Sequence, residues 1–159
     1  MFERFDDSVK RVVVRAQELC IARADEVIGS EHLLLAAAEA SNPVLLSVGL
    51  AADVLQEAWD RLESDALAAV GVDAALAPPW RARWSRRRHI PFSGSAKEAL
   101  KGALREALDR GERQIRIEHL ILALTVQPPH DRAVRILRRA GMPSSSLRAA
   151  LVEELKRAS

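Results

Sequence analysis

A motif of nine residues occurs twice in this chain and constrains its architecture more than any other feature. The first copy, IGSEHLLLA, spans residues 28–36, and the second, IRIEHLILA, spans residues 115–123, 87 positions later. Both copies keep Glu-His-Leu-x-Leu-Ala and the isoleucine three residues before the glutamate. The segments 5–36 and 92–123 align without a gap and are identical at 11 of 32 positions. This repeat predicts two homologous units, with the function at or between them.

The composition favours helices in both units. Hydrophobic residues make up 48% of the chain and aromatic residues only 4%, and Ala, Leu, Glu and Arg dominate. These are strong helix formers, so we expect an all-α protein with about eight helices. Apolar residues at helical spacing support this expectation near the start of each unit, namely Val9, Val12, Val13, Ala16 and Cys20, and Ala96, Ala99, Leu100, Ala103, Leu104, Ala107 and Leu108.

Turn and capping residues set the expected helix boundaries. In the first unit we expect helices from Asp6 or Asp7 to about residue 24, from an N-cap at Ser30 to the break at residues 42–43, and over residues 44–48 and 51–69. In the second unit we expect them from Ser93 or Ser95 to residue 111, over residues 117–126 and 131–140, and from about residue 143. After the motif the offset between the units grows from 87 to 92, which predicts a shorter third helix in the first unit.

We place the unit boundaries at residues 1–70 and 92–159, with a linker at 71–91. The net charge is +2, but five arginines and no acid lie between Trp80 and His89, namely Arg81, Arg83, Arg86, Arg87 and Arg88. The rest of the chain holds 19 basic and 22 acidic residues. Arginines interleaved with Trp80 and Trp84 can contact a polyanion such as nucleic acid. The alternatives are an acidic protein surface, or a solvated linker whose tryptophans pack on the domain.

Other sequence features exclude several classes of protein. A single cysteine, Cys20, allows no internal disulfide, which favours a reducing compartment. No apolar run reaches the length of a membrane span, and the first residues lack the pattern of a signal peptide. We therefore expect a cytoplasmic protein without a membrane segment. No set of residues suggests catalysis, so we expect neither an enzyme nor a cofactor.

Three stretches carry a resemblance to a known family. They are MFERF at residues 1–5, IGSEHLLL at 28–35, and HIPFS at 89–93 followed by Ala96-Lys97. Together they resemble the N-terminal domain of the Clp/Hsp100 unfoldases, closest to the ClpC type. The resemblance covers the chain except about residues 64–88, and it implies a pseudo-twofold tandem of two four-helix Clp repeats packed as one domain.

Full-length members of that family continue into ATPase modules, whose phosphate-binding loop needs Gly-x4-Gly-Lys-Ser/Thr. This sequence does not contain that pattern. The expectation is a free-standing repeat protein, and the alternative is the N-terminal fragment of a full-length Clp ATPase.

The resemblance also implies a ligand for the motif glutamates. In ClpC domains, residues corresponding to Glu31 and Glu118 resemble receptors for the guanidinium of phosphoarginine, and a nearby hydroxyl helps to hold the phosphate. A carboxylate suits a guanidinium because the pair can form two parallel hydrogen bonds. Ser93 keeps the hydroxyl in the second unit, whereas Asp6 replaces it in the first, so we expect Glu118 to be the better site. The plainer interpretation is a carboxylate that stabilises a helix start.

The motif histidines, His32 and His119, lack a second metal ligand at helical spacing. We therefore interpret them as packed or capping residues and predict no metal site.

A second surface is implied by the resemblance alone. Residues that match Phe2, Phe92 and Lys97 lie where the two repeats meet, at a site that resembles the docking surface for cyclic-peptide antibiotics that target ClpC. The plainer interpretation is packing between the repeats, which we expect also for Phe5.

These observations lead to two hypotheses. The first is a non-enzymatic binding module, an accessory, adaptor or decoy for the Clp unfoldase–protease system, whose partners are a ClpC-type unfoldase, adaptor or substrate proteins, or cyclic peptides. The second is a small nucleic-acid-binding regulator that uses the arginine-rich linker.

Overall fold

The computed structural model describes residues 2–40, 42–71 and 89–158. Within these ranges it contains one 3-10 turn and eight α-helices, which are η1 (Phe2–Arg4), α1 (Asp7–Ala22), α2 (Ser30–Glu39), α3 (Pro43–Ser47), α4 (Ala52–Ala69), α6 (Gly94–Asp109), α7 (Ile117–Thr125), α8 (Arg132–Arg139) and α9 (Ser144–Ala158). We refer to α1–α4 as the first repeat and to α6–α9 as the second. The all-α prediction is confirmed. The third helix is indeed shorter in the first repeat, with five residues in α3 against eight in α8.

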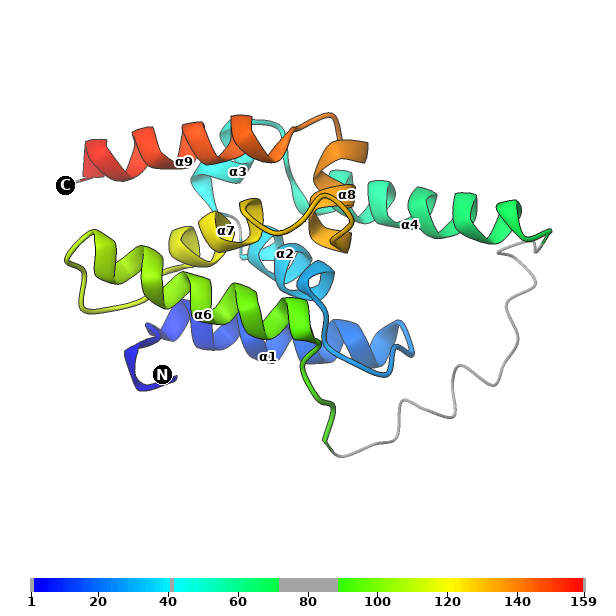
Figure 1. Cartoon of the computed structure of the whole chain (residues 1–159), viewed down its shortest axis with the longest axis horizontal. Coiled ribbons are helices and arrows are strands. Elements are labelled where there is room, and N and C mark those ends of the chain that lie inside the picture. Colours follow the sequence, from blue (N-terminus) through cyan, green and yellow to red (C-terminus); the bar gives the residue numbers. More distant parts are fainter. Residues whose placement is uncertain (1, 41, 72–88, 159) are drawn as a thin grey trace.

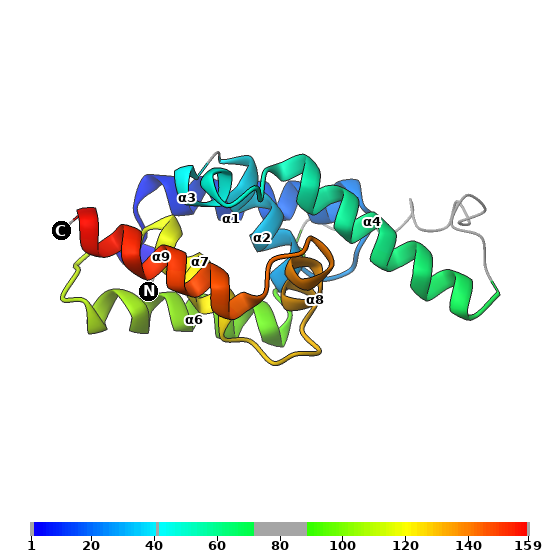
Figure 2. The same cartoon turned by 90° about the horizontal axis from the view of Figure 1, so that it is seen from above.

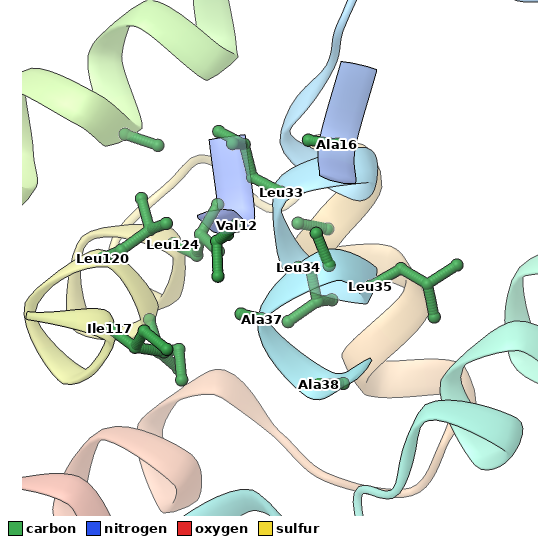
Figure 3. Close-up of a cluster of buried hydrophobic side chains, with 14 of the residues drawn as sticks. Val12, Ala16, Leu33, Leu34, Leu35, Ala37, Ala38, Ile117, Leu120 and Leu124 are labelled. Carbon is green, nitrogen blue, oxygen red and sulfur yellow. The ribbon is translucent and has the colours of Figure 1, made fainter. Parts of the chain in front are cut away.

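The two motif helices form the centre of the molecule. Nine of the ten residues of α2 and eight of the nine residues of α7 are buried. Helices that are apolar on every side must be covered on every side, and here the remaining helices surround this pair. Figure 1 shows α1 and α6 on one side, α3 and α9 on the other, and α4 with α8 at one end. In Figure 3, Leu34 of α2 and Leu120 of α7 belong to one shared cluster of apolar side chains.

The first helix of each repeat packs its apolar stripe against the motif helix of the same repeat. In α1 the buried positions are Val9, Val12, Ala16, Leu19 and Cys20, as the helical spacing predicts. In α6 a glycine allows an especially close approach, since a Cβ atom on Gly102 would lie 2.9 Å from the Cβ atom of Ala123 in α7. Small residues at this crossing let the two helices pack tightly.

Two short backbone bridges tie the repeats to each other. Phe5 pairs with Ile115, and Ile28 pairs with Phe92, both in parallel orientation. The two bridges are equivalent, because Phe92 corresponds to Phe5 and Ile115 corresponds to Ile28. In each bridge the phenylalanine of one repeat pairs with the isoleucine of the other. Each repeat therefore contributes its first residues to the loop that precedes the motif helix of the other repeat.

Candidate functional site

Each motif histidine caps the start of its own helix. The Nδ1 atom of His32 accepts a hydrogen bond from the N–H of Gly29 at 2.9 Å, and that of His119 accepts one from the N–H of Arg116 at 3.0 Å. Both rings are inaccessible to solvent. Because Nδ1 is an acceptor, each neutral ring carries its proton on Nε2. The interpretation of both histidines as packed, capping residues is confirmed.

The opposite ring nitrogen faces a carboxylate in both repeats. His32 Nε2 lies 2.8 Å from Asp25 Oδ2, and His119 Nε2 lies 3.4 Å from Glu112 Oε1. Burial is the largest effect on His119 and lowers its pKa, and it outweighs the opposing attraction of Glu112. Our sequence reasoning missed these two acids. Their signal was an acid seven residues before the histidine in both copies of the repeat.

The predicted N-cap of α2 is wrong. Gly29 occupies the cap position, and the hydroxyl of Ser30 turns to the second repeat. Ser30 Oγ lies 2.9 and 2.8 Å from the two carboxylate oxygens of Asp131, which is the N-cap of α8. A buried carboxylate from a distant segment competes successfully for this hydroxyl, because a charged acceptor makes the stronger hydrogen bond.

The inter-repeat bridges also change the grouping of the candidate ligand residues. The N–H of Ser93 donates to the carbonyl of Ile28 at 2.9 Å, three residues before Glu31. The N–H of Asp6 donates to the carbonyl of Ile115 at 3.1 Å, three residues before Glu118. The sequence led us to pair Ser93 with Glu118 within one unit, whereas these backbone bonds join Ser93 to the loop before Glu31. Ser93 lies beside the loop that leads to Glu31, and Asp6 lies beside the loop that leads to Glu118.

We define the Glu31 centre as Glu31, Ser93 and Arg132. The Glu31 side chain is nearly buried and folds back over Gly29, where a Cβ atom would lie 2.2 Å from its Oε2 atom. Arg132, the first residue of α8, places Nη1 3.6 Å from Glu31 Oε1. Ser93 caps α6, and its Oγ atom accepts a hydrogen bond from the N–H of Ala96 at 3.1 Å. This centre thus combines one carboxylate, one guanidinium and a hydroxyl at a helix start.

A groove of about 630 Å³ adjoins this centre. Gly94 and Ser95 of the first turn of α6 line one side of it, and His130 and Arg132 line the other. The helix start, Arg105 and Arg132 contribute positive potential to this groove, and Glu98 and Asp131 contribute negative potential.

We define the Glu118 centre as Glu118, Asp6 and Asn42. Glu118 is half-buried and accepts a hydrogen bond from Asn42 Nδ2 at 3.0 Å. Arg116 stands at the position of Gly29, so the space over which Glu31 folds is occupied by a side chain here. The Asp6 carboxylate accepts bonds from Ser8 Oγ at 2.5 Å and from a backbone N–H of α1 at 2.9 Å. Two carboxylates and an amide give this centre the poorer match to a phosphate.

The structure places the three residues of the expected docking surface at two different bridges. Phe2 is 51% exposed and packs edge-on against Phe5, at 5.2 Å between ring centroids, beside the bridge to Ile115. Phe92 is half-buried at the other bridge, and Lys97 follows it as an exposed residue of α6. Phe2 thus lies beside the loop before α7, whereas Lys97 lies in the first turn of the helix that follows the bridge to Ile28. The expected packing of Phe5 between the repeats is confirmed.

The five arginines of the linker, Arg81, Arg83, Arg86, Arg87 and Arg88, lie outside the residues that the structure describes. The polyanion contact predicted for them stays a prediction.

The structure also describes Cys20 and the groups that could form a metal site or a membrane span. Cys20 is fully buried, and burial, with smaller contributions from Asp25 and Glu31, raises the pKa of its thiol to about 11. Across residues 2–40, 42–71 and 89–158, no three His, Cys, Asp or Glu side chains gather in a way that could hold a metal ion. No helix in the same ranges has both the length and the apolar character needed to cross a bilayer.

Comparison with known proteins gives matches across the whole chain. The family model described as the Clp repeat (R) N-terminal domain matches residues 91–159. An ATP-dependent Clp protease ATP-binding subunit, a ClpA homolog from Porphyra purpurea, is 31% identical over 98% of this chain and 17% of that protein. An uncharacterised protein of Mycobacterium tuberculosis is 32% identical over 97% of this chain and 54% of its own length. The chain thus spans only part of these relatives.

Solved structures give the same result for the fold. The N-terminal domain of the chaperone ClpD from Arabidopsis thaliana matches with a TM-score of 0.72 and 22% identity, covering 98% of this chain and 97% of that one. The N-terminal domain of Hsp104 from Candida albicans matches with a TM-score of 0.64 and 17% identity, covering 94% and 90%. Residues 91–159 thus match the Clp repeat N-terminal domain family, and nearly the whole chain has the fold of Clp N-terminal domains.

Proposed function

We propose that this protein is a protein- or peptide-binding module of the Clp unfoldase–protease system that acts as an adaptor, accessory or decoy, without chemistry of its own. Its partners are a ClpC-type unfoldase, an adaptor or substrate proteins. Support comes from the match to Clp N-terminal domains and from the two centres at the contacts between repeats. A surface built from two repeats presents side chains of both in fixed geometry, which suits recognition.

We further propose phosphoarginine on a partner protein as the ligand, with the Glu31 centre as its site. The observation that carries this proposal is the 3.6 Å approach of Arg132 to Glu31 beside the first turn of α6. Phosphoarginine has a guanidinium and a phosphate, and this centre offers a carboxylate for the first and positive groups for the second. On binding, the guanidinium of the ligand takes the place of Arg132 on Glu31, and Arg132 turns to the phosphate.

A calorimetric titration with phosphoarginine tests this assignment. We expect saturable binding that the E31Q variant weakens at least about tenfold, the loss of one charge-assisted contact. The E118Q variant is the matched control and should bind within about twofold of wild type. Unmodified arginine and phosphoserine, each with only half of the ligand chemistry, should bind weakly. Equal losses in E31Q and E118Q, or no saturable binding, would contradict the proposal.

Cyclic peptides that target ClpC are further candidate ligands, at the junctions of the repeats. The exposed ring of Phe2 supports such a contact, because a large aromatic side chain in water favours burial by a partner. The same titration with such a peptide tests the two bridges separately, with F2A at one and K97A at the other. If both variants bound the peptide as tightly as wild type, neither bridge would be the docking surface.

A further inference from the structure

Helix α4 is longer than the described part of the protein that covers it. It spans 18 residues, but its buried residues, Leu55, Ala58 and Trp59, all lie in its N-terminal half. In Figures 1 and 2 the second half extends past α8 at the end of the molecule. The apolar stripe nevertheless continues along this half through Leu62 and Leu67, which are half-buried.

A groove of about 180 Å³ lies between this half of α4 and helix α8. Its apolar lining includes Leu62 and Leu67 of α4 and Ile136 of α8. Arg132 and Arg135, one turn apart on α8, line it as well. The groove has room for a large apolar side chain, and the two guanidinium groups border it.

The acids at this groove already have partners within the protein. Asp25 faces His32 Nε2 at 2.8 Å, and Glu63 accepts hydrogen bonds from Arg23 Nη2 and from Trp59 Nε1, each at 3.0 Å. The Arg135 side chain, in contrast, makes no hydrogen bond or ion pair with another described residue. The charge that remains available in the groove is therefore positive.

We propose that this groove binds an acidic amphipathic peptide segment of a partner protein. An apolar side chain of the peptide occupies the space between Leu62, Leu67 and Ile136, and flanking Asp or Glu residues pair with Arg135 and Arg132. The complementary charge fixes the orientation of the peptide, and the apolar contact contributes affinity. This surface shares Arg132 with the Glu31 centre, and its other lining residues are different.

A nucleic acid fits the same groove less well. Binding of single strands relies on stacking of bases on exposed aromatic rings. Trp59 is 2% exposed, with the guanidinium carbon of Arg23 3.7 Å from its ring centroid and His32 packed edge-on at 5.1 Å. No free aromatic face is thus available at this ring, and the half-buried leucines favour an apolar side chain instead.

Fluorescence anisotropy with labelled 12-residue peptides tests the proposal. The probe carries Leu at helical spacing with Glu at the flanking positions. One control peptide replaces each Leu by Ser, and another replaces each Glu by Lys. We expect the probe to bind and both controls to bind at least about tenfold more weakly, since each lacks one of the two contacts.

Matched variants locate the contact on the protein. R135E should weaken binding at least about tenfold, while R138E, an exposed arginine of the same helix outside the groove, should change it less than about twofold. L67Q should weaken binding about fivefold or more, and V70Q, at a 73% exposed position of the same segment, should not. Circular dichroism confirms that each variant folds.

Two further arms test whether the linker arginines or the Glu31 centre account for the binding instead. The titration is repeated in a chain whose five linker arginines are replaced by alanine, and in E31Q. We expect R135E to weaken peptide binding in both backgrounds, so the groove stands even if phosphoarginine binding fails. The proposal would be overturned if R135E and R138E weakened binding equally, or if the Ser-containing peptide bound as tightly as the probe. It would also be overturned if replacing the linker arginines alone abolished binding. A last contradicting result would be single-stranded DNA that binds more tightly than the peptide and depends on Arg135.

Discussion

The motif histidines are buried rings whose Nδ1 atoms each accept a backbone hydrogen bond. In the second repeat, His119 Nδ1 accepts from the N–H of Arg116, and Nε2 lies 3.4 Å from the Glu112 carboxylate without a hydrogen bond. A neutral ring is required, because a protonated Nδ1 could not accept the backbone hydrogen bond. The N-terminal cap of α7 therefore depends on a neutral His119.

This dependence predicts a pH effect on stability. The folded protein holds the pKa of His119 below its ordinary value of about 6.5, mainly through burial. As the pH falls below about 6.5, the unfolded chain takes up a proton that the folded chain does not, so the free energy of unfolding decreases. The loss continues until the pH reaches the lowered pKa of the folded state.

Urea unfolding between pH 7.5 and 5 measures this effect. In H119Q the amide oxygen can still accept the capping hydrogen bond, but the group no longer titrates. We expect a smaller decrease in stability over this range in H119Q than in wild type. An unchanged decrease would show that another group causes it.

Single residues also show where sequence reasoning succeeds and fails. Local capping propensity offered Asp6 or Asp7 for α1 and Ser93 or Ser95 for α6. The side chains of Asp6 and Ser93 do accept bonds from the first turns of these helices. The same propensity failed for Ser30, whose hydroxyl binds Asp131, 101 residues away. Capping propensity depends only on a residue and its neighbours in the chain. It therefore could not predict that the distant Asp131 carboxylate binds the Ser30 hydroxyl.

The third helices differ in length but have the same function at their N-termini. Asn42 caps α3, and Asp131 caps α8, each by accepting bonds from two backbone N–H groups. Each cap also reaches the motif helix of the other repeat, since Asn42 donates to Glu118 and Asp131 accepts from Ser30. One side chain therefore stabilises a helix end and a contact between repeats at once.

Substitution of Asn42 separates these two contributions. N42A removes both, and we expect it to lower the free energy of unfolding by about 1–2 kcal/mol or somewhat more, because the cap is buried. N42D keeps the cap acceptor but places a carboxylate against Glu118. We expect it to be destabilised at pH 7 and partly restored by adding E118Q. Urea unfolding of N42A, N42D, N42D/E118Q and E118Q gives the coupling free energy between residues 42 and 118. A coupling of zero would contradict the contact between these side chains.

At the level of helices the sequence was informative, and at the level of their connections it was not. Apolar spacing and capping residues predicted the helices of both repeats, and the change in offset between the copies predicted the shortened α3. It did not predict that Ser93 accompanies Glu31 rather than Glu118. Because Ile28 and Ile115 are the same residue in the same context, pairing within a repeat and pairing between repeats look identical in sequence.

The whole molecule has one core to which both repeats contribute. Val12 and Leu34 of the first repeat belong to the same apolar cluster as Leu120 and Leu124 of the second. Neither motif helix could be covered by its own repeat alone, since each is buried on nearly every side. The repeats are therefore expected to unfold together.

A chain with Trp59 as its only tryptophan tests this cooperativity. The W80F/W84F variant retains only this reporter, which lies in α4 of the first repeat. We expect the urea transition seen by Trp59 fluorescence to coincide with the transition of helical circular dichroism from both repeats. Two separated transitions would show that the repeats unfold independently.

The reciprocal bridges have a consequence for association. Phe5 with Ile115 and Ile28 with Phe92 form an isologous contact, in which the same patch serves both partners. A polypeptide with only one such repeat could satisfy that patch with an identical second copy, and the contact would close at two chains. Joining both halves in one chain replaces a dimer that dilution would dissociate with an intramolecular contact at a fixed effective concentration. It also allows the two halves to diverge, so that one centre can pair Glu31 with Arg132 while the other pairs Glu118 with Asn42.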